Sequence, residues 1–170
     1  MRQLDGKVVL ITGSTQGIGA ATARASVAAG ARVMIHGRKE ALAKAMVDEL
    51  GEANAAYVIQ DLAAPDAAER IMAATLDHFG ELDVLVNNAG IFPRNDVDTL
   101  TPDNYELIMT VNLRTPLFLC QAAVKAFRAH GRGGSIINIG SMNAHTGQTD
   151  LLVYSISKGG LMTMTRNLAD

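Results

Sequence analysis

Five short apolar segments, each followed by a longer segment of helical character, constrain the fold of this chain more than any other feature. They are rich in Val and Ile and span residues 7–12, 32–36, 55–59, 83–87 and 135–140. Such segments are typical of strands buried on both faces of a sheet. Helices are expected at residues 17–30, 39–50, 65–80, 101–131 and from about residue 150 to the end. Because strands that alternate with helices form parallel sheets with right-handed crossovers, we predict a doubly wound α/β domain.

The expected helices begin and end at residues that favour helix boundaries. Gly30 and Gly51 follow two of them as C-terminal caps, and Thr101 is a suitable N-cap for the longest one. Pro116 lies inside that longest segment, so we expect it to kink the helix. Ligands of doubly wound sheets bind beyond the carboxyl ends of the strands, and the motifs below follow predicted strands at that edge.

Composition and charge are those of an ordinary globular protein. The chain has 170 residues, 48% of them hydrophobic and 19% charged, with a net charge of -2. A chain of this length is enough for one domain, residues 1–170, with a hydrophobic core. The small net charge indicates neither a nucleic-acid-binding face nor a basic membrane-binding patch. The N-terminal apolar run is too short for a signal or membrane segment. The single cysteine, Cys120, is interpreted as a core residue, and its isolation favours a cytoplasmic location.

The segment TGSTQGIG, residues 12–19, lies between the first predicted strand and the first predicted helix. Its glycines permit a tight turn, a close approach to a pyrophosphate and close packing of the helix on the sheet. Free N–H groups at the helix N-terminus favour an anion there. The spacing is G-x-x-x-G-x-G, not the standard G-x-G-x-x-G, and the alternative is a purely structural turn. The predicted phosphate contacts are Gly13, Ser14, Thr15, Gln16, Gly17, Ile18 and Gly19.

The residues after the second predicted strand bear on the choice of cofactor. A site for NAD places an acid there to bind the ribose 2′-OH, but this chain has no carboxylate before Glu40. Gly37 leaves room, and the planar guanidinium of Arg38 is suited to a 2′-phosphate. We therefore favour NADP(H), with NAD(H) as the alternative if Arg38 and Lys39 only begin a solvated helix. His36 is interpreted as a strand-end residue and not as a ligand.

Taken together, these motifs resemble those of the short-chain dehydrogenase/reductase family. The segment TGSTQGIG looks like the family's glycine motif, and NNAG at residues 87–90 looks like the motif after its fourth strand. The family's catalytic set is matched, in order and approximate spacing, by Asn112, Ser141, Tyr154 and Lys158. The resemblance runs from about residue 4 to residue 170. It implies a Rossmann-type sheet with strand order 3-2-1-4-5 that lacks the family's last two strands.

The resemblance also implies cofactor contacts outside the glycine loop. Asp61, after the third predicted strand, stands where family members contact the adenine ring. The further implied contacts are Leu62, Asn88, Ala89, Gly90, Tyr154 and Lys158. The implied reaction is hydride transfer between the nicotinamide and a carbonyl or alcohol substrate, in which the protein positions the reactants.

Each residue of the matched set has an implied role. Tyr154 would be the general acid in carbonyl reduction and the base in alcohol oxidation, although a free phenol has a pKa near 10. Lys158, one helical turn later, would favour the phenolate by roughly 3 kcal/mol at about 5 Å and an effective dielectric near 20. It would also hold the nicotinamide ribose. Ser141 would hydrogen-bond the substrate oxygen, and Asn112 would hold a water that connects Lys158 to solvent.

Each of these residues also has a purely structural interpretation. Asn112 is alternatively a polar helix residue bonded to a neighbouring carbonyl, and Ser141 caps a following turn. Tyr154 is alternatively a core aromatic residue with a tethered hydroxyl. Asn87 and Asn88 alternatively turn the chain after the fourth strand, a role compatible with a wall of the cofactor site.

The sequence departs from the family pattern in two respects. Arg114 and Pro116 follow Asn112 where many relatives have small residues, which affects a helix used in the family's usual pairing of subunits. Family members run to about 250 residues, as many α/β domains do, so we expect the chain to be a fragment. A fifth strand without its neighbour would then expose an open sheet edge and apolar surface.

Two functions remain open from the sequence. The favoured function is that of an NADP(H)-dependent oxidoreductase acting on a small carbonyl or alcohol. The resemblance also implies that the full-length protein is a homo-oligomer, a tetramer or a dimer. The other function is that of a dinucleotide-binding module without turnover. The expected lining of the substrate mouth is Phe92, Pro93, Arg94, Asn143, His145, Thr146 and Gln148. These side chains favour a polar substrate such as a sugar, a polyol or an acyl β-ketone.

Overall fold

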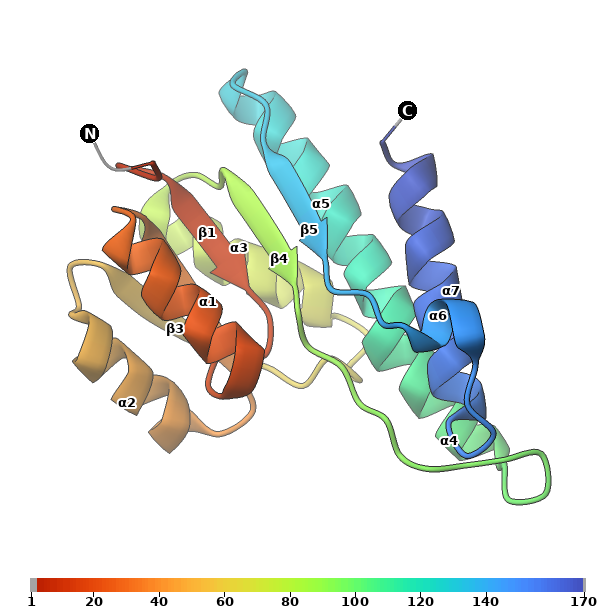
Figure 1. The fold of residues 1–170 in the computed structure, drawn as a ribbon. Helices are drawn as coiled ribbons and strands as arrows, with labels where there is room; N and C mark the ends of the chain where they lie inside the picture. Colours follow the sequence, from red (N-terminus) through yellow and green to blue (C-terminus); the bar gives the residue numbers. More distant parts are fainter. Residues whose placement is uncertain (1–2, 170) are drawn as a thin grey trace.

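A five-stranded parallel sheet forms the centre of the molecule in the computed structural model, which describes residues 3–169. The strand order is β3-β2-β1-β4-β5, and every neighbouring pair is parallel (Figure 1). The strands are β1 (Val8–Ile11), β2 (Arg32–Gly37), β3 (Ala55–Ile59), β4 (Val84–Asn87) and β5 (Ser135–Asn138). The predicted doubly wound sheet and its strand order are thus confirmed. Most strands are one or two residues shorter than the apolar segments that predicted them.

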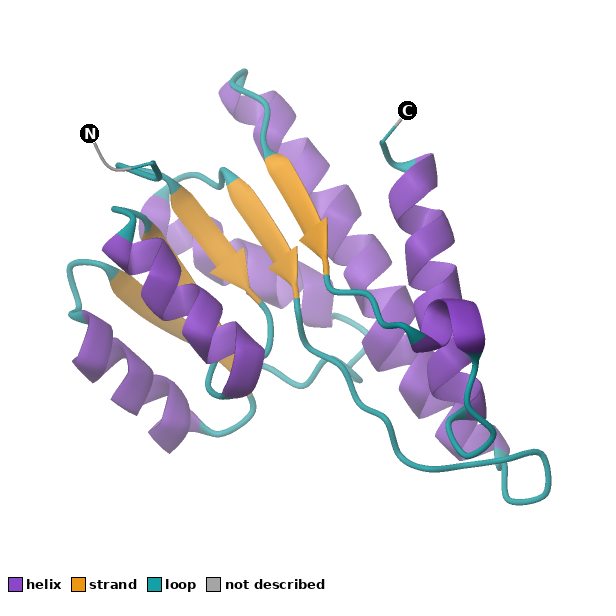
Figure 2. Ribbon diagram, in the orientation of Figure 1, coloured by secondary structure: helices purple, strands orange, loops and turns teal. Residues whose placement is uncertain are grey.

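Helices cover both faces of this sheet (Figure 2). One face is covered by α1 (Gly17–Ala28) and α2 (Glu40–Leu50), and the other by α3 (Ala67–Phe79) and α5 (Thr115–His130). The helix α7 (Leu152–Asn167) lies beyond β5, next to α4 (Pro102–Met109) and a short helix, α6 (Asn143–Thr146), that was not predicted. The order of strands reverses between β1 and β4. Ligands of such sheets bind beside the carboxyl ends of the strands at that point.

Alternate residues of β1 lie on opposite faces of the sheet and belong to two separate cores. Val8 and Leu10 pack in the core under α3 and α5, whereas Val9 and Ile11 pack in the core under α1 and α2. All four side chains are almost completely buried. This accounts for the uninterrupted apolar character of the segment, because each face of a doubly wound sheet is covered by helices.

The long helix predicted over residues 101–131 is continuous, but its α-helical hydrogen bonding changes before the proline. Thr101 is the predicted N-cap, and its side chain accepts a hydrogen bond from the N–H of Asn104. The helix then passes through a π turn, η1 (Thr110–Arg114), before continuing as α5. Pro116 has no N–H, and its ring would clash with the carbonyl of residue 112 in a regular α-helix. The disturbance expected from Pro116 therefore lies in the turn that precedes the proline, where the wider π turn relieves this clash.

The continuous helix Pro102–His130 is long and apolar enough, by length and composition alone, to cross a membrane. Nearly half of its most apolar window is buried, and it packs against α3 and α7. A single such helix is weak evidence for a membrane span, because the core helix of a soluble protein passes the same test.

The strand β5 lies at the edge of the sheet, as expected. Ile137 on this strand is 49% exposed. A groove separates β5 from α7 and is lined by Asn138, Gly140, Leu161, Met162, Thr165 and Arg166. The expectation of an open edge with exposed apolar surface at the fifth strand is therefore confirmed for the described residues.

Candidate active site

The glycine-rich loop between β1 and α1 is compact, and its glycines are needed for that shape. Gly13 and Gly17 adopt left-handed conformations, with φ of 64° and 58°. A Cβ atom on Gly19 would lie 2.3 Å from the carbonyl oxygen of Gly13 and 2.5 Å from Nδ2 of Asn88. Space around Gly17, in contrast, is open to at least 4 Å. The loop is therefore closely packed on its inner side and open at the start of α1.

The first turn of α1 is suited to an anion. Its leading N–H groups have no partner within the helix, and in the described chain no side chain caps them and no acidic residue lies in that turn. Gln16, Gly17 and Ile18 are exposed there. Because these N–H groups are uncapped and lie in an exposed turn, the loop fits the phosphates of a dinucleotide.

Asn88 and Thr12 join the glycine loop to the segment after β4. The Asn88 side chain donates to the carbonyl oxygens of Thr12 at 2.9 Å and Gly13 at 3.1 Å. The Thr12 hydroxyl accepts from the N–H groups of Asn88 and Ala89. The predicted wall residues Asn88 and Ala89 thus lie directly against the predicted phosphate loop. In the same motif, Asn87 donates to Oδ1 of Asn138 on β5 at 2.8 Å, a structural contact.

His36 was interpreted only as a strand-end residue, but it is bonded to two other segments of the chain. Its Nδ1 accepts the N–H of Gly13 at 3.1 Å, and its Nε2 lies 3.0 Å from the carbonyl oxygen of Gln60. Its main chain exchanges hydrogen bonds with Ser14, both at 2.9 Å. The sequence offered only one signal for this role: a polar residue at the end of a buried strand.

The residues around the end of β2 include those on which the cofactor prediction rests. Gly37 is buried, and a Cβ atom there would lie 2.6 Å from Cγ2 of Thr15. Arg38 is exposed and makes no ion pair with any residue in the range 3–169. Asp61 is exposed after β3 and accepts the N–H of Ala63. Leu62, in contrast, is buried in the core, and its carbonyl oxygen accepts from the Thr115 hydroxyl.

Tyr154 and Lys158 lie one turn apart on α7, with the Lys158 ammonium 5.9 Å from the centre of the Tyr154 ring. Lys158 is only 4% exposed, and its Nζ donates to the carbonyl oxygen of Ile139 at 2.6 Å. Burial lowers the pKa of Lys158. Phe92, from the loop after β4, contacts the Tyr154 ring edge-on at 6.0 Å between ring centres. Tyr154 is half-buried and is therefore not an ordinary core aromatic residue.

Asn112 connects the π turn to both the loop after β4 and α7. Its side-chain amide accepts from the N–H of Ile91 and donates to the Ile91 carbonyl oxygen, at 2.9 and 2.8 Å. It also donates to Oγ of Ser157, which in turn donates to the Tyr154 carbonyl oxygen. Ser157 was not identified from the sequence. The alternative interpretation of Asn112, a polar residue bonded to a neighbouring carbonyl, is thus realised in the structure.

Gly90 lies where this cluster meets the loop after β4. A Cβ atom on Gly90 would be 3.5 Å from Oδ1 of Asn112 and 3.7 Å from Nζ of Lys158. The loop carrying the NNAG motif therefore contacts the glycine loop at one end and the Asn112–Lys158 cluster at the other. The structure brings together these three predicted groups of residues.

Ser141 lies in the loop between β5 and α6. Its Oγ accepts the N–H of Asn143, so Ser141 does cap the following turn, as the alternative interpretation held. The hydrogen of this hydroxyl remains available to a ligand. Asn143 donates to Gln148, and Gln148 donates to Asp150, which also pairs with Arg94.

Asn95 is a further residue that the sequence did not identify. Its side chain accepts the N–H of Val153 at 3.2 Å and donates to the Pro93 carbonyl oxygen at 2.9 Å. Its main-chain carbonyl accepts from Leu152, and its N–H donates to Asp150. Asn95 is 2% exposed. It therefore caps the N-terminus of α7 from a distant loop.

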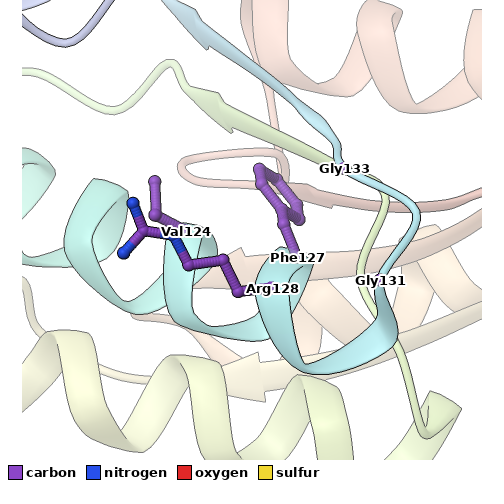
Figure 3. Close-up of a pocket in the computed structure, with 5 residues that line it drawn as sticks. All are labelled: Val124, Phe127, Arg128, Gly131 and Gly133. Atoms are coloured by element: carbon purple, nitrogen blue, oxygen red, sulfur yellow. The ribbon is translucent and has the colours of Figure 1, made fainter.

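A hollow in the described chain lies away from this cluster (Figure 3). It is open and shallow, at the end of α5 that is opposite the carboxyl ends of the strands, and is lined by Val124, Phe127, Arg128, Gly131 and Gly133. Figure 3 shows Phe127 turned toward the ribbon of residues 131–133. Within residues 3–169, no group of three or more His, Cys, Asp or Glu side chains is arranged to hold a metal ion.

Curated relatives support the assignment suggested by these residues. The chain is 38% identical over 165 residues to a sorbitol dehydrogenase from Cereibacter sphaeroides, covering 97% of this chain and 64% of that protein. It is 36% identical to a galactitol 2-dehydrogenase from Agrobacterium fabrum, covering 98% of this chain and 65% of that protein. The chain thus spans a little less than two thirds of the length of these relatives.

Solved structures and a family model lead to the same family. A short chain dehydrogenase from Mycobacterium smegmatis superposes with a TM-score of 0.92 at 32% identity, covering 98% of this chain and 71% of that one. The sequence model described as short chain dehydrogenase matches residues 7–170. This match covers nearly the whole chain, and the chain therefore belongs to the short-chain dehydrogenase family.

Proposed function

We propose that the chain is the dinucleotide-binding and catalytic part of an NADP(H)-dependent oxidoreductase that interconverts a carbonyl and an alcohol. One observation carries this proposal: a Cβ atom on Gly90 would lie within contact distance of both Asn112 and Lys158, while Asn88 and Ala89 contact the glycine loop. A dinucleotide with its phosphates at the start of α1 would thus extend along the NNAG segment toward Tyr154. The bound cofactor supplies the hydride chemistry.

In this proposal the residues of α7 move the proton. Tyr154 donates a proton to the substrate oxygen during reduction and accepts one during oxidation. Lys158, with its ammonium 5.9 Å from the centre of the Tyr154 ring, places a positive charge beside the phenol. Lys158 can also exchange its bond to the Ile139 carbonyl for a ribose hydroxyl.

Ser141 and Asn112 act on either side of this pair. Because the Ser141 oxygen already accepts a hydrogen bond from Asn143, its hydroxyl hydrogen is directed elsewhere and donates to the substrate oxygen. Asn112 fixes Ile91 and Ser157, and so holds the loop after β4 against α7. We assign to Asn112 also the water that connects Lys158 with solvent.

Two features support NADP(H) over NAD(H). Gly37 stands where a carboxylate would bind the ribose 2′-OH of NAD, and a side chain there would come within 2.6 Å of the Thr15 methyl group, which would have to shift. Arg38, exposed and without an ion-pair partner among the described residues, can bind a 2′-phosphate through its planar guanidinium. We further assign Asp61 to the adenine end of the site.

The substrate proposal rests on polar side chains near α7 and on the names of two relatives. Arg94, Asp150, Gln148 and Asn143 form a continuous hydrogen-bonded network at the surface. Such a network suits a hydroxylated molecule, and the relatives named above are a sorbitol and a galactitol dehydrogenase. We propose a sugar or polyol as substrate, a cytoplasmic location, and a homo-oligomer for the full-length protein.

Fluorescence titration with NADPH and NADH tests the cofactor proposal. We expect Arg38→Ala to weaken NADPH binding about 10- to 100-fold, as the loss of a charge-assisted hydrogen bond worth about 1.5–3 kcal/mol requires, and to leave NADH binding unchanged. Lys39→Ala, which removes the neighbouring exposed cation, is the matched control and should have little effect. Equal binding of both cofactors by the unmodified chain would refute the NADP(H) preference. Binding of neither would refute the dinucleotide site.

A further inference from the structure

A buried imidazole lies beneath the phosphate-binding loop and takes no part in the chemistry proposed above. His36 is 2% exposed at the end of β2. It is hydrogen-bonded to the glycine loop on one side and to the end of β3 on the other, through Gly13 and Gln60. It thus connects the three segments that surround the proposed cofactor phosphates and ribose.

The partners of the ring determine its tautomer. A main-chain N–H can only donate, so Nδ1 of His36 must accept from Gly13 and carries no hydrogen. The Gln60 carbonyl can only accept, so Nε2 carries the hydrogen and donates to it. Only the neutral Nε2–H form satisfies both contacts. Protonation at Nδ1 would place two N–H groups against each other.

The contact with Gly13 fixes the loop at its tightest point. Gly13 has a left-handed backbone, and its carbonyl oxygen is held by Asn88. Its N–H is held by His36, and the next residue, Ser14, is bonded through both main chain and side chain to the His36 main chain. These contacts hold Gly13 and Ser14 inward, which leaves the following N–H groups at the start of α1 free for a ligand.

We propose that His36 is a positioning residue, whose neutral imidazole holds the phosphate-binding loop in its ligand-ready conformation and whose protonation releases that loop. This proposal rests on the proposed function only in taking a dinucleotide as the ligand of the loop. The hydrogen bond itself requires no ligand. The Gly13 N–H, if it lost this acceptor, would be left without a partner at a closely packed site.

The surroundings of His36 favour the neutral ring. Burial lowers the pKa of His36 to about 4, outweighing the hydrogen bond to Gln60 and the charge of Asp61, which raise it; Arg38 lowers it further. Asp61 faces the ring from the end of β3 and Arg38 from its own chain segment, while loop residues 12–16 contain no titratable side chain. A released loop would expose the ring, with an ordinary pKa near 6.5. Acid therefore shifts the equilibrium toward the released loop by about tenfold per pH unit between about 6.5 and 4.

Two substitutions separate the two contacts of the ring. His36→Asn places an amide oxygen near the position of Nδ1, so it can still accept from Gly13 but does not reach Gln60. His36→Gln extends to the position of Nε2, so it can donate to Gln60 but leaves Gly13 without an acceptor. His78→Gln, at an exposed histidine on α3, is the control for the loss of an imidazole.

The measurements are amide hydrogen exchange at Gly13 without cofactor and NADPH affinity, both followed from pH 7.5 to pH 5. We expect His36→Gln to speed Gly13 exchange and weaken NADPH binding by about tenfold or more, the equivalent of about 1.4 kcal/mol. His36→Asn should retain most of the affinity and lose the acid dependence seen in the unmodified chain. Unchanged Gly13 protection in His36→Gln would overturn the proposal.

The role of His36 and the proposed function can fail separately. If the unmodified chain binds neither NADPH nor NADH, the proposed function fails, yet Gly13 exchange without cofactor still decides the role of His36. If both variants unfold, the tautomer in the unmodified chain decides it, read from long-range proton–nitrogen correlations of the ring. The Nε2–H form is expected, and an Nδ1–H form would overturn the proposal.

Discussion

Asn95 should stabilise the N-terminus of α7 more than its position in a surface loop suggests. Asn95→Ala removes the acceptor of the Val153 N–H and the donor to the Pro93 carbonyl oxygen, while the main-chain bonds of residue 95 remain. Val153 is completely buried, so its N–H cannot bond to water instead. Leaving the buried Val153 N–H unpaired costs about 1–3 kcal/mol, and losing the hydrogen bond to Pro93 costs about 1 kcal/mol more. We therefore expect a loss of about 3 kcal/mol in the free energy of unfolding.

Urea denaturation of the unmodified chain and of two variants measures this loss. Asn95→Asp is the matched control, because its carboxylate still accepts the Val153 N–H and places a negative charge at a helix N-terminus, but cannot donate to Pro93. We expect the Asp variant to recover at least half of the lost free energy. Amide exchange at Val153 should be fast in the Ala variant and slow in the Asp variant. The cap would be refuted if all three proteins unfolded at the same urea concentration.

Three further outcomes follow from the packing and charges of the described residues. Gly19→Ala should lower the free energy of unfolding by about 2 kcal/mol and abolish NADPH fluorescence enhancement, because its Cβ would lie 2.3 Å from the Gly13 oxygen. Gly17→Ala has open space and should cost only the roughly 1 kcal/mol of a left-handed residue, so equal effects would contradict this reasoning. Burial raises the pKa of Asp83, but hydrogen bonds from Val8 and Lys7 lower it more, so its contribution to stability should be lost as pH falls below about 4. Melting temperatures at pH 7 and pH 3 should therefore differ less in Asp83→Asn than in the unmodified chain; an unchanged difference would exclude this role. Burial raises the pKa of the Cys120 thiol to about 11, so iodoacetamide at pH 8 should label Cys120 only after the chain unfolds. Rapid labelling of the native chain would show that this thiol is accessible and ionised, and would contradict the prediction.

Sequence alone located the sheet because its strands are local features. The alternation of Val8, Val9, Leu10 and Ile11 between two cores requires an apolar residue at every position, and that requirement is visible in the sequence. The glycine loop and the NNAG segment were located for the same reason. The hydrogen bonds by which Asn88 joins these two segments could not be predicted from the sequence, because Asn88 could equally have served only to turn the chain after β4.

The residues that the sequence did not identify form hydrogen bonds with partners that are far away along the chain. Asn95 caps a helix that begins more than fifty residues later, and His36 bonds to a loop that precedes it by more than twenty. Nothing adjacent to either residue indicates such a partner, since a polar residue at a strand end or in a loop is usually solvated. The proline was recognised as an interruption because its effect is local. The position of that interruption depended on how the preceding turn could widen.

The π turn allows one continuous helix to serve two partners in different directions. A π turn closes hydrogen bonds between residues five apart instead of four, so it contains one more residue than an α turn. Since each residue advances an α-helix by about 100°, the apolar stripe after residues 110–114 is offset by about that angle from the stripe before them. On the two sides of this offset, α4 faces α7 and α5 faces α3. Deleting a single residue here would bring the two stripes into phase and turn one of the two faces away from its partner, although no core side chain would have been changed.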